Sequence, residues 1–261
     1  MIKMSKAMLT AIALSTPFTA YAEDWKFEFT PYIWAAANEG KSGAYGDLNG
    51  VPFESISPID ISFSDLAEEL DFGTMFNFSA KKNNWFMYSE VTVLSIENAE
   101  VAVPPPADAS SASIKTDISG EIIDIAAGYR LMERSNFDLY GYIGARYFNL
   151  DVTLKTKRTK LNNEVVKRNI NTGDDFIDPF VGVHAKWKIN NTFALQGRLE
   201  VGGFADQPSE NTLVSVTLDH NLSDNWSLKY FYRMMNIDYK DNGFVYDMEV
   251  TGPGIGATYK F

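Results

Sequence analysis

The sequence has no cysteine and only two histidines, His184 and His220. The absence of cysteine excludes disulfide bridges, thiolate metal sites, a cysteine nucleophile and the lipid-carrying cysteine of a lipoprotein. Basic residues are outnumbered, because 34 acidic and 23 basic side chains give a formal net charge of −11. Contacts to phosphate need clustered lysine and arginine, so such a chain is a poor nucleic-acid binder. We therefore expect a protein held together by packing and backbone pairing, with no nucleic-acid partner.

Long apolar runs are missing too. After residue 22 no run approaches the ~20 residues that a membrane-spanning helix needs, a property that a soluble periplasmic protein would share. The first residues follow the order of a secretory signal peptide, with a positive start, an apolar stretch and small residues at a cleavage site: Lys3 and Lys6, residues 7–14, and Ala20-Tyr21-Ala22. We predict a signal peptide over residues 1–22 and one domain over residues 23–261. The alternative is an N-terminal membrane helix.

Aromatic residues make 14% of the chain, and much of the chain alternates with a period of two. In residues 25–35, for example, Phe27, Phe29 and Ile33 alternate with Lys26 and Glu28. This alternation is typical of a β-strand with two different faces. About ten segments show it or are otherwise strand-like, namely residues 25–35, 72–81, 85–97, 123–131, 138–147, 181–188, 193–201, 214–219, 226–234 and 255–261.

The connections between these segments alternate between short and long. Short turns are expected at residues 82–84, 132–136, 190–191 and 223–225, and long polar connections at 38–70, 98–113, 155–175, 204–210 and 241–244. This asymmetry is typical of outer-membrane barrels, which have short periplasmic turns and longer external loops. We predict an all-β fold: a single transmembrane antiparallel up-and-down β-barrel of about ten strands, with about 8 or 12 as the alternatives.

A closed barrel is the physical solution because every backbone N–H and C=O must be paired within the protein in hydrocarbon. The alternative is a soluble periplasmic sandwich or lipocalin-like barrel, which would expose a large apolar belt to water. Residues 64–70 carry a helix-capping pattern. We expect a short helix there at the rim of the first external loop, or alternatively a gating lid.

The end of the chain carries a second localisation signal. Phe261 is terminal, and Tyr259 precedes it on the same face of an alternating strand. We interpret both residues as the signal that the outer-membrane assembly machinery reads. The expected location is therefore the cell outer membrane.

Charged and polar residues of both signs occupy the strand face opposite the apolar one. The predicted lumen-lining residues are Lys26, Glu28, Glu90, Asp124, Arg130, Asp138, Arg146, Asp178, His184, Lys186, Arg198, Glu200, Asp219, Lys229 and Arg233. They either pair across a mostly plugged barrel or line a small polar channel. Side chains just fill a barrel of about eight strands, whereas about 16–18 strands leave an open channel.

The leading functional prediction is a narrow porin or channel for ions or small solutes. The main alternative is a non-conducting barrel with a structural or surface-interaction role. An outer-membrane enzyme is the third, but catalysis usually needs a histidine. His184 fits a hydrogen-bonded interior residue, and His220 precedes a turn on the periplasmic side. We assign no catalytic residue, no cofactor and no metal site.

The predicted external loops carry charged residues for which we expect binding partners. We expect the acids Asp174, Asp175, Asp238, Asp241, Asp247 and Glu249 to form a solvated rim, with weak calcium binding as the alternative. The third long loop is basic, with Lys155, Lys157, Arg158, Lys160, Lys167 and Arg168. Lysine and arginine bind phosphate well, so the expected partners are outer-membrane lipid and lipopolysaccharide.

Several motifs occur together across nearly the whole domain. They lie at residues 30–36, 60–66, 70–72, 141–147, 178–182, 197–204, 232–233 and 252–254. In this combination the chain resembles a poorly characterised family of proteobacterial outer-membrane β-barrels, the porin-like outer membrane proteins. The resemblance implies the barrel fold and the outer-membrane location, and it carries over no catalytic residue.

Overall fold

The computed structural model describes residues 25–48, 51–64, 70–101, 109–204 and 209–261. The predicted signal peptide over 1–22 and most of the predicted helix over 64–70 lie outside these residues. Within the described part of the chain, no helix is long and apolar enough to span a bilayer.

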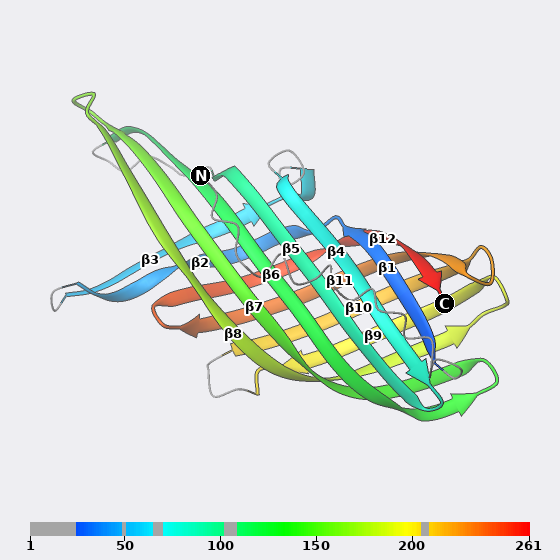
Figure 1. Cartoon of the computed structure of the whole chain (residues 1–261). Helices are drawn as coiled ribbons and strands as arrows, with labels where there is room; N and C mark the ends of the chain where they lie inside the picture. The colour runs from blue at the N-terminus through cyan, green and yellow to red at the C-terminus, as the bar shows by residue number, and fades with distance from the viewer. Residues whose placement is uncertain (1–24, 49–50, 65–69, 102–108, 205–208) are drawn as a thin grey trace, which may run out of the picture.

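One antiparallel sheet of twelve strands makes up the described part of the chain (Figure 1). The strands are β1 (Lys26–Trp34), β2 (Ala37–Leu48), β3 (Val51–Ile61), β4 (Leu70–Lys82), β5 (Trp85–Val101), β6 (Ala109–Arg134), β7 (Phe137–Lys160), β8 (Val165–Lys188), β9 (Phe193–Gly202), β10 (Ser209–Asn221), β11 (Trp226–Asp241) and β12 (Phe244–Lys260). All of them except β2 and β3 form a closed ring, because β1 pairs with both β4 and β12. Twelve minus two gives ten barrel strands, so the predicted strand number is confirmed.

The alternation of side chains gives the barrel an apolar outer surface. Ile33, Ile125 and Ile143 point outward and are 65%, 65% and 68% exposed. Exposed aromatic residues gather at one end of this belt, near the short turns: Trp85, Tyr129, Trp187, Trp226 and Tyr259. Such girdles mark the interface between membrane and water. We call the end that carries the short turns and the C-terminus the turn end, and the opposite end the loop end.

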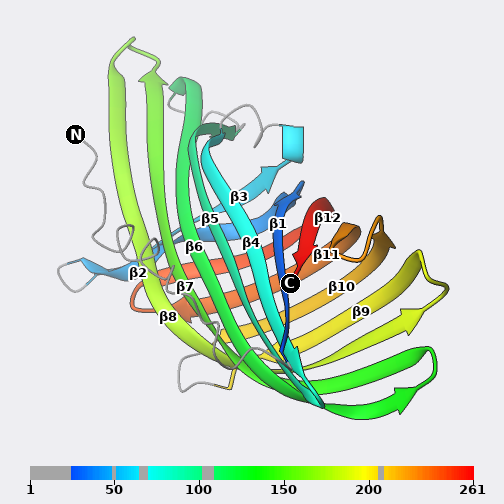
Figure 2. The same ribbon diagram turned by 45° about the vertical axis from the view of Figure 1, so that its right-hand side comes forward.

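The predicted difference between the two ends of the barrel is present, but the long connections are mostly paired strand. β6, β7 and β8 contain 26, 24 and 24 residues, whereas crossing a bilayer takes about 9–11. The segment predicted as a loop over residues 155–175 is a hairpin whose strands pair from Thr159↔Val165 onward. The loop was predicted from the polar side chains of this segment. A segment with polar side chains can still form paired strands, because the pairing satisfies its backbone N–H and C=O groups. Figures 1 and 2 show the β7–β8 hairpin projecting at the loop end.

A second hairpin, β2–β3, lies within the segment predicted as the first external loop. β1 pairs with the turn-end half of β12, and β2 pairs with its loop-end half from Phe244↔Ala44 to Thr251↔Ala37. Gly40 permits this pairing, because its φ is 153° and a Cβ there would lie 2.1 Å from the Asp247 carbonyl oxygen. The pairing of β1 with β4 ends at Pro31↔Phe76. The barrel wall is therefore unpaired between β1 and β4 toward the loop end.

Candidate functional site: the barrel interior

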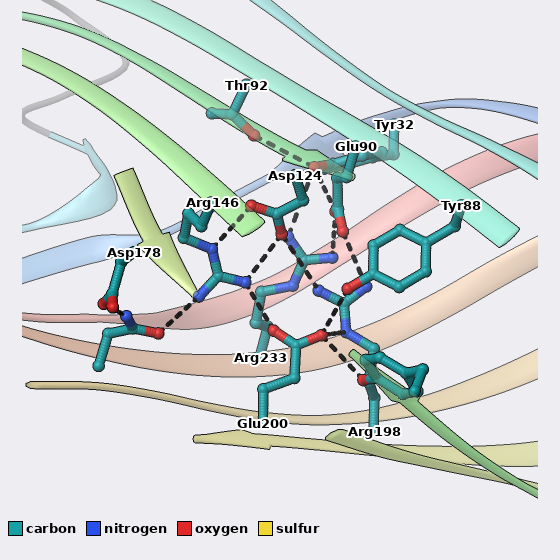
Figure 3. A network of polar contacts seen from close by, with 12 residues as sticks. Tyr32, Tyr88, Glu90, Thr92, Asp124, Arg146, Asp178, Arg198, Glu200 and Arg233 are labelled. Atoms are coloured by element: carbon teal, nitrogen blue, oxygen red, sulfur yellow. Dashed lines mark hydrogen bonds and ion pairs between the residues drawn. The ribbon is translucent and has the colours of Figure 1, made fainter. Parts of the chain in front are cut away.

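A layer of buried charges crosses the middle of the barrel (Figure 3). Arg146, on β7, is 0% exposed. Its Nε and Nη2 atoms donate to the two carboxylate oxygens of Asp124 at 2.7 and 2.8 Å, and Nη2 also donates to Glu200 at 2.6 Å. Nη1 donates to the Asn211 side chain at 3.1 Å. Forked contacts of this kind fix the orientation of a guanidinium group.

Two further arginines complete the charged layer. The Glu90 carboxylate accepts from Arg198 at 2.8 Å and from Arg233 at 2.6 Å. The Tyr32 hydroxyl donates to the same carboxylate at 2.6 Å and lies 3.2 Å from the Thr92 hydroxyl. These five residues come from β1, β5, β9 and β11, so the contacts tie opposite walls of the barrel together.

Tyrosines and an aspartate surround the arginines. Glu200 accepts from the Tyr88 and Tyr142 hydroxyls at 2.7 and 2.8 Å. Gly182 leaves room for the Tyr142 ring, since a Cβ there would lie 2.4 Å from Tyr142 Cζ. Asp178 is 0% exposed and accepts from the Asn211 side chain and from the Gly203 backbone N–H.

The charges of the layer nearly cancel. Three arginines face three directly paired carboxylates, those of Glu90, Asp124 and Glu200. Charges buried away from water are tolerated only when they are paired and hydrogen-bonded. Each of the three arginines has a carboxylate partner, although Arg198 Nε and Nη2 and Arg233 Nε make no hydrogen bond. We call this layer at the centre of the barrel the plug.

A small polar chamber lies on the turn-end side of the plug. Its volume is about 120 Å³, and its walls include Glu28, Lys81, His184, Gln196 and Lys229. Lys229 Nζ donates to Glu28 at 3.2 Å, and His184 Nε2 lies 2.9 Å from the Gln196 side-chain oxygen. Nearby, Lys186 Nζ lies 3.4 Å from Asp219.

The interior on the loop-end side is apolar, which differs from the expectation of a polar inner face along every strand. Its buried residues are Trp34, Ile59, Ile61, Phe148, Leu150, Val152, Phe176, Leu213, Met235, Ile237, Tyr239, Phe244, Tyr246 and Met248. The rings of Phe176 and Tyr239 stack across this space with centroids 3.9 Å apart. The walls at the loop end therefore contact each other through these rings.

The residues that the sequence predicts for the lumen fall into three groups. The plug brings together Glu90, Asp124, Arg146, Asp178, Arg198, Glu200 and Arg233. Glu28, His184, Lys186, Asp219 and Lys229 lie in or beside the turn-end chamber. Lys26, Arg130 and Asp138 lie at the turn-end rim, where Arg130 contacts Glu133 at 2.8 Å and Asp138 at 3.6 Å.

Sequence reasoning missed Tyr32, Tyr88, Tyr142, Asn211 and Lys81 as polar members of the interior. Each shares the inward face of its strand with a predicted residue or chamber wall. None of the three tyrosines is among the predicted lumen-lining residues, which were chosen for their charge or, for His184, their imidazole ring. The useful signal was their position at an even spacing from a charged residue, as with Tyr88 and Glu90.

The two histidines have different surroundings. His184 is buried against the rings of Phe86 and Tyr140. His220 stacks on Phe193 next to the turn end, with centroids 4.7 Å apart. Among the described residues, no group of three potential ligands is placed to hold a metal ion.

The C-terminus closes the barrel. The backbone N–H groups of Phe27 and Phe261 each donate to the carbonyl of the other, at 2.9 and 3.0 Å. Phe261 and Tyr259 point outward and are exposed. Their reading by the assembly machinery stays a prediction.

No protein-family model matches the sequence, and no curated protein sequence matches it either. The outer membrane protease OmpT from Escherichia coli has a similar structure, with a TM-score of 0.60 and 10% identity over 92% of this chain and 98% of that chain. Ail, the attachment invasion locus protein of Yersinia pestis, has a TM-score of 0.34 and 11% identity over 92% and 99% of the two chains. For the KdgM porin the values are 0.31 and 8% over 90% and 99%. The likeness to OmpT shows the fold alone, which is that of an outer-membrane β-barrel.

Proposed function

We propose that this chain is an outer-membrane barrel that works by binding a partner at its loop end. With the interior in the arrangement described above, we propose that it does not conduct ions. The observation that carries the proposal is the plug. Arg146 and its partner Glu200 are almost completely buried and mutually neutralised. An ion that crossed the barrel would have to break these contacts and leave buried charges unpaired, which is unfavourable.

The length of the strands supports a role at the loop end. β6, β7 and β8 have 24 to 26 residues, and only about 9–11 are needed for the bilayer. More than half of each strand therefore lies outside the membrane. A long, paired and internally packed extension offers a stable surface for a partner.

A narrow channel is the second candidate. The polar turn-end chamber favours it, because Glu28, Lys81 and Lys229 already line a space of about 120 Å³. In this case the plug would have to rearrange to admit an ion.

An enzyme activity would need His184, so His184→Ala is the variant that would remove it.

Single-channel recording in planar bilayers tests the proposal. We expect no conductance steps from the folded native chain. The double variant Tyr32→Ser/Arg233→Ser removes side chains that separate the turn-end chamber from the loop-end interior, and it leaves Glu90 paired with Arg198. We expect this variant to gain small, discrete steps.

The matched control is Ile33→Ser/Tyr232→Ser, which changes the outward neighbours of the same two residues. It should stay silent. Discrete steps from the native chain that shift on charge reversal at Arg198 would contradict the proposal and support the narrow channel.

A further inference from the structure

The loop-end interior is not completely filled. A cavity of about 320 Å³ remains between the walls formed by β1, β2, β4, β5, β6, β7, β11 and β12. Apolar side chains such as Met75, Leu94, Ile122, Met235 and Met248 make most of its lining. An engineered cavity of about 150 Å³ holds benzene, and ligand sites start at about 300 Å³. The space is therefore large enough for a ligand and too large to be a packing defect.

The wall is mainly apolar, and the polar groups of Tyr32 and Trp34 in it already have hydrogen-bond partners, although the Asn38 side chain also lines the cavity. The Tyr32 hydroxyl is engaged by Glu90 and Thr92. The Trp34 indole N–H donates to the Gly252 carbonyl oxygen at 3.1 Å. A polar ligand would lose its water without gaining these partners, whereas hydrocarbon gains free energy in proportion to the apolar surface that it buries.

The cavity reaches the outer surface of the barrel beside β1. Ile33 lines it, although the Ile33 side chain points outward and is 65% exposed. The position coincides with the gap in the wall, since β1 and β4 stop pairing at Pro31↔Phe76 and the cavity lining continues at Gly73 and Met75. On β1, then, the cavity lining includes a residue of the apolar belt.

We infer that this cavity takes up a single hydrocarbon chain of a lipid from the outer leaflet of the membrane. The gap beside Ile33 provides the entrance, and the volume suits one chain segment with the headgroup remaining outside. The inference does not depend on the plug, because conductance reports on the charged layer and occupancy reports on the space beyond it.

Fluorescence quenching of Trp34 tests the inference. Trp34 is buried and lines the cavity, whereas Trp85, Trp187 and Trp226 are exposed in the turn-end girdle. Replacing these three and Trp25 by phenylalanine leaves Trp34 as the single tryptophan. In phosphatidylcholine vesicles whose lipid carries a dibrominated chain, we expect the bromine atoms to quench most of the Trp34 emission relative to unbrominated vesicles.

Two matched variants locate the bromine. Ile118→Phe/Ile122→Phe enlarges inward residues of β6 that line the cavity, and it should restore most of the emission. Ile123→Phe/Ile125→Phe enlarges outward residues of the same strand and should leave quenching unchanged. Heat-modifiable migration on gels confirms that each variant is folded. Absent quenching in the folded single-tryptophan chain, or equal quenching in both variants, would overturn the inference. Quenching by free bromobenzene without quenching by the brominated lipid would overturn lipid as the occupant.

Discussion

Arg146 shows how a single side chain organises the interior of the barrel. It joins Asp124, Glu200 and Asn211 while being 0% exposed, and its guanidinium carbon lies 5.1 Å from the centre of the Phe180 ring. A lysine could not make the same contacts, because only the planar guanidinium group offers a fork of donors. The carboxylates around it are tolerated in the interior because this cation is present.

We therefore expect Arg146→Met to destabilise the barrel by about 3–5 kcal/mol, since it leaves buried carboxylates without their partner. Urea unfolding in detergent or vesicles measures the change. Arg168→Met, at an exposed position of the β7–β8 hairpin, is the control and should stay within about 0.5 kcal/mol of the native chain. Similar losses in both variants would mean that the plug does not stabilise the fold.

At the scale of elements, the β2–β3 hairpin extends the barrel wall without being part of the ring. It pairs with β12 along residues 244–251 and buries Ile59 and Ile61 in the loop-end interior. The ring itself closes nearer the turn end, through the pairing of β1 with β4 and β12. The hairpin therefore stabilises the loop-end half, while the membrane-spanning half has its own pairing.

This division predicts the effect of removing the hairpin. Asn38 and Ile61 are direct partners, so a short glycine-containing turn can join them in place of the residues between. We expect a barrel that still folds and migrates as heat-modifiable, but whose loop-end strands are cut much faster by protease. Replacing the turn at residues 161–164 with the same linker is the control. Loss of the folded band itself would show that the ring needs the hairpin.

At the scale of the whole molecule, a cluster of basic residues lies at the loop end. The basic residues of the β7–β8 hairpin gather near its tip, beyond the apolar belt. Lys160 Nζ donates to Glu164 at 2.9 Å, which holds the pKa of Glu164 below its usual range. Lys157 and Lys167 are exposed and directly opposite each other, and like charges in this arrangement repel. An anionic partner would relieve that repulsion.

We expect lipopolysaccharide phosphate to be this partner, because lysine and arginine bind phosphate through charge-assisted hydrogen bonds. Neutralising Lys155, Lys157, Arg158, Lys160, Lys167 and Arg168 to glutamine should reduce several-fold the lipopolysaccharide that remains bound after detergent extraction. Glutamine at Lys26, Lys188 and Lys260, near the turn end, is the control and should have no effect. Unchanged retention in the six-residue variant would contradict the prediction.

The sequence by itself determined the ring of strands. Alternation with a period of two assigns each residue to a face, and hydrocarbon on one face leaves a closed barrel as the way to pair every backbone group. Short turns such as the one at Asn83, whose φ is 54°, were readable for the same local reason. The inward charges could be named because they share the face opposite the apolar rows.

Only the tertiary structure decided which of these charges meet. Glu90 and Arg233 are 143 residues apart and come together only when the ring closes. The tyrosine hydroxyls, the β2–β3 hairpin and the apolar loop-end interior were also hidden from sequence reasoning. Alternation in the sequence indicates which face of a strand a side chain occupies. It does not indicate whether the opposite wall of the barrel has a charge, a ring or an empty space at that level.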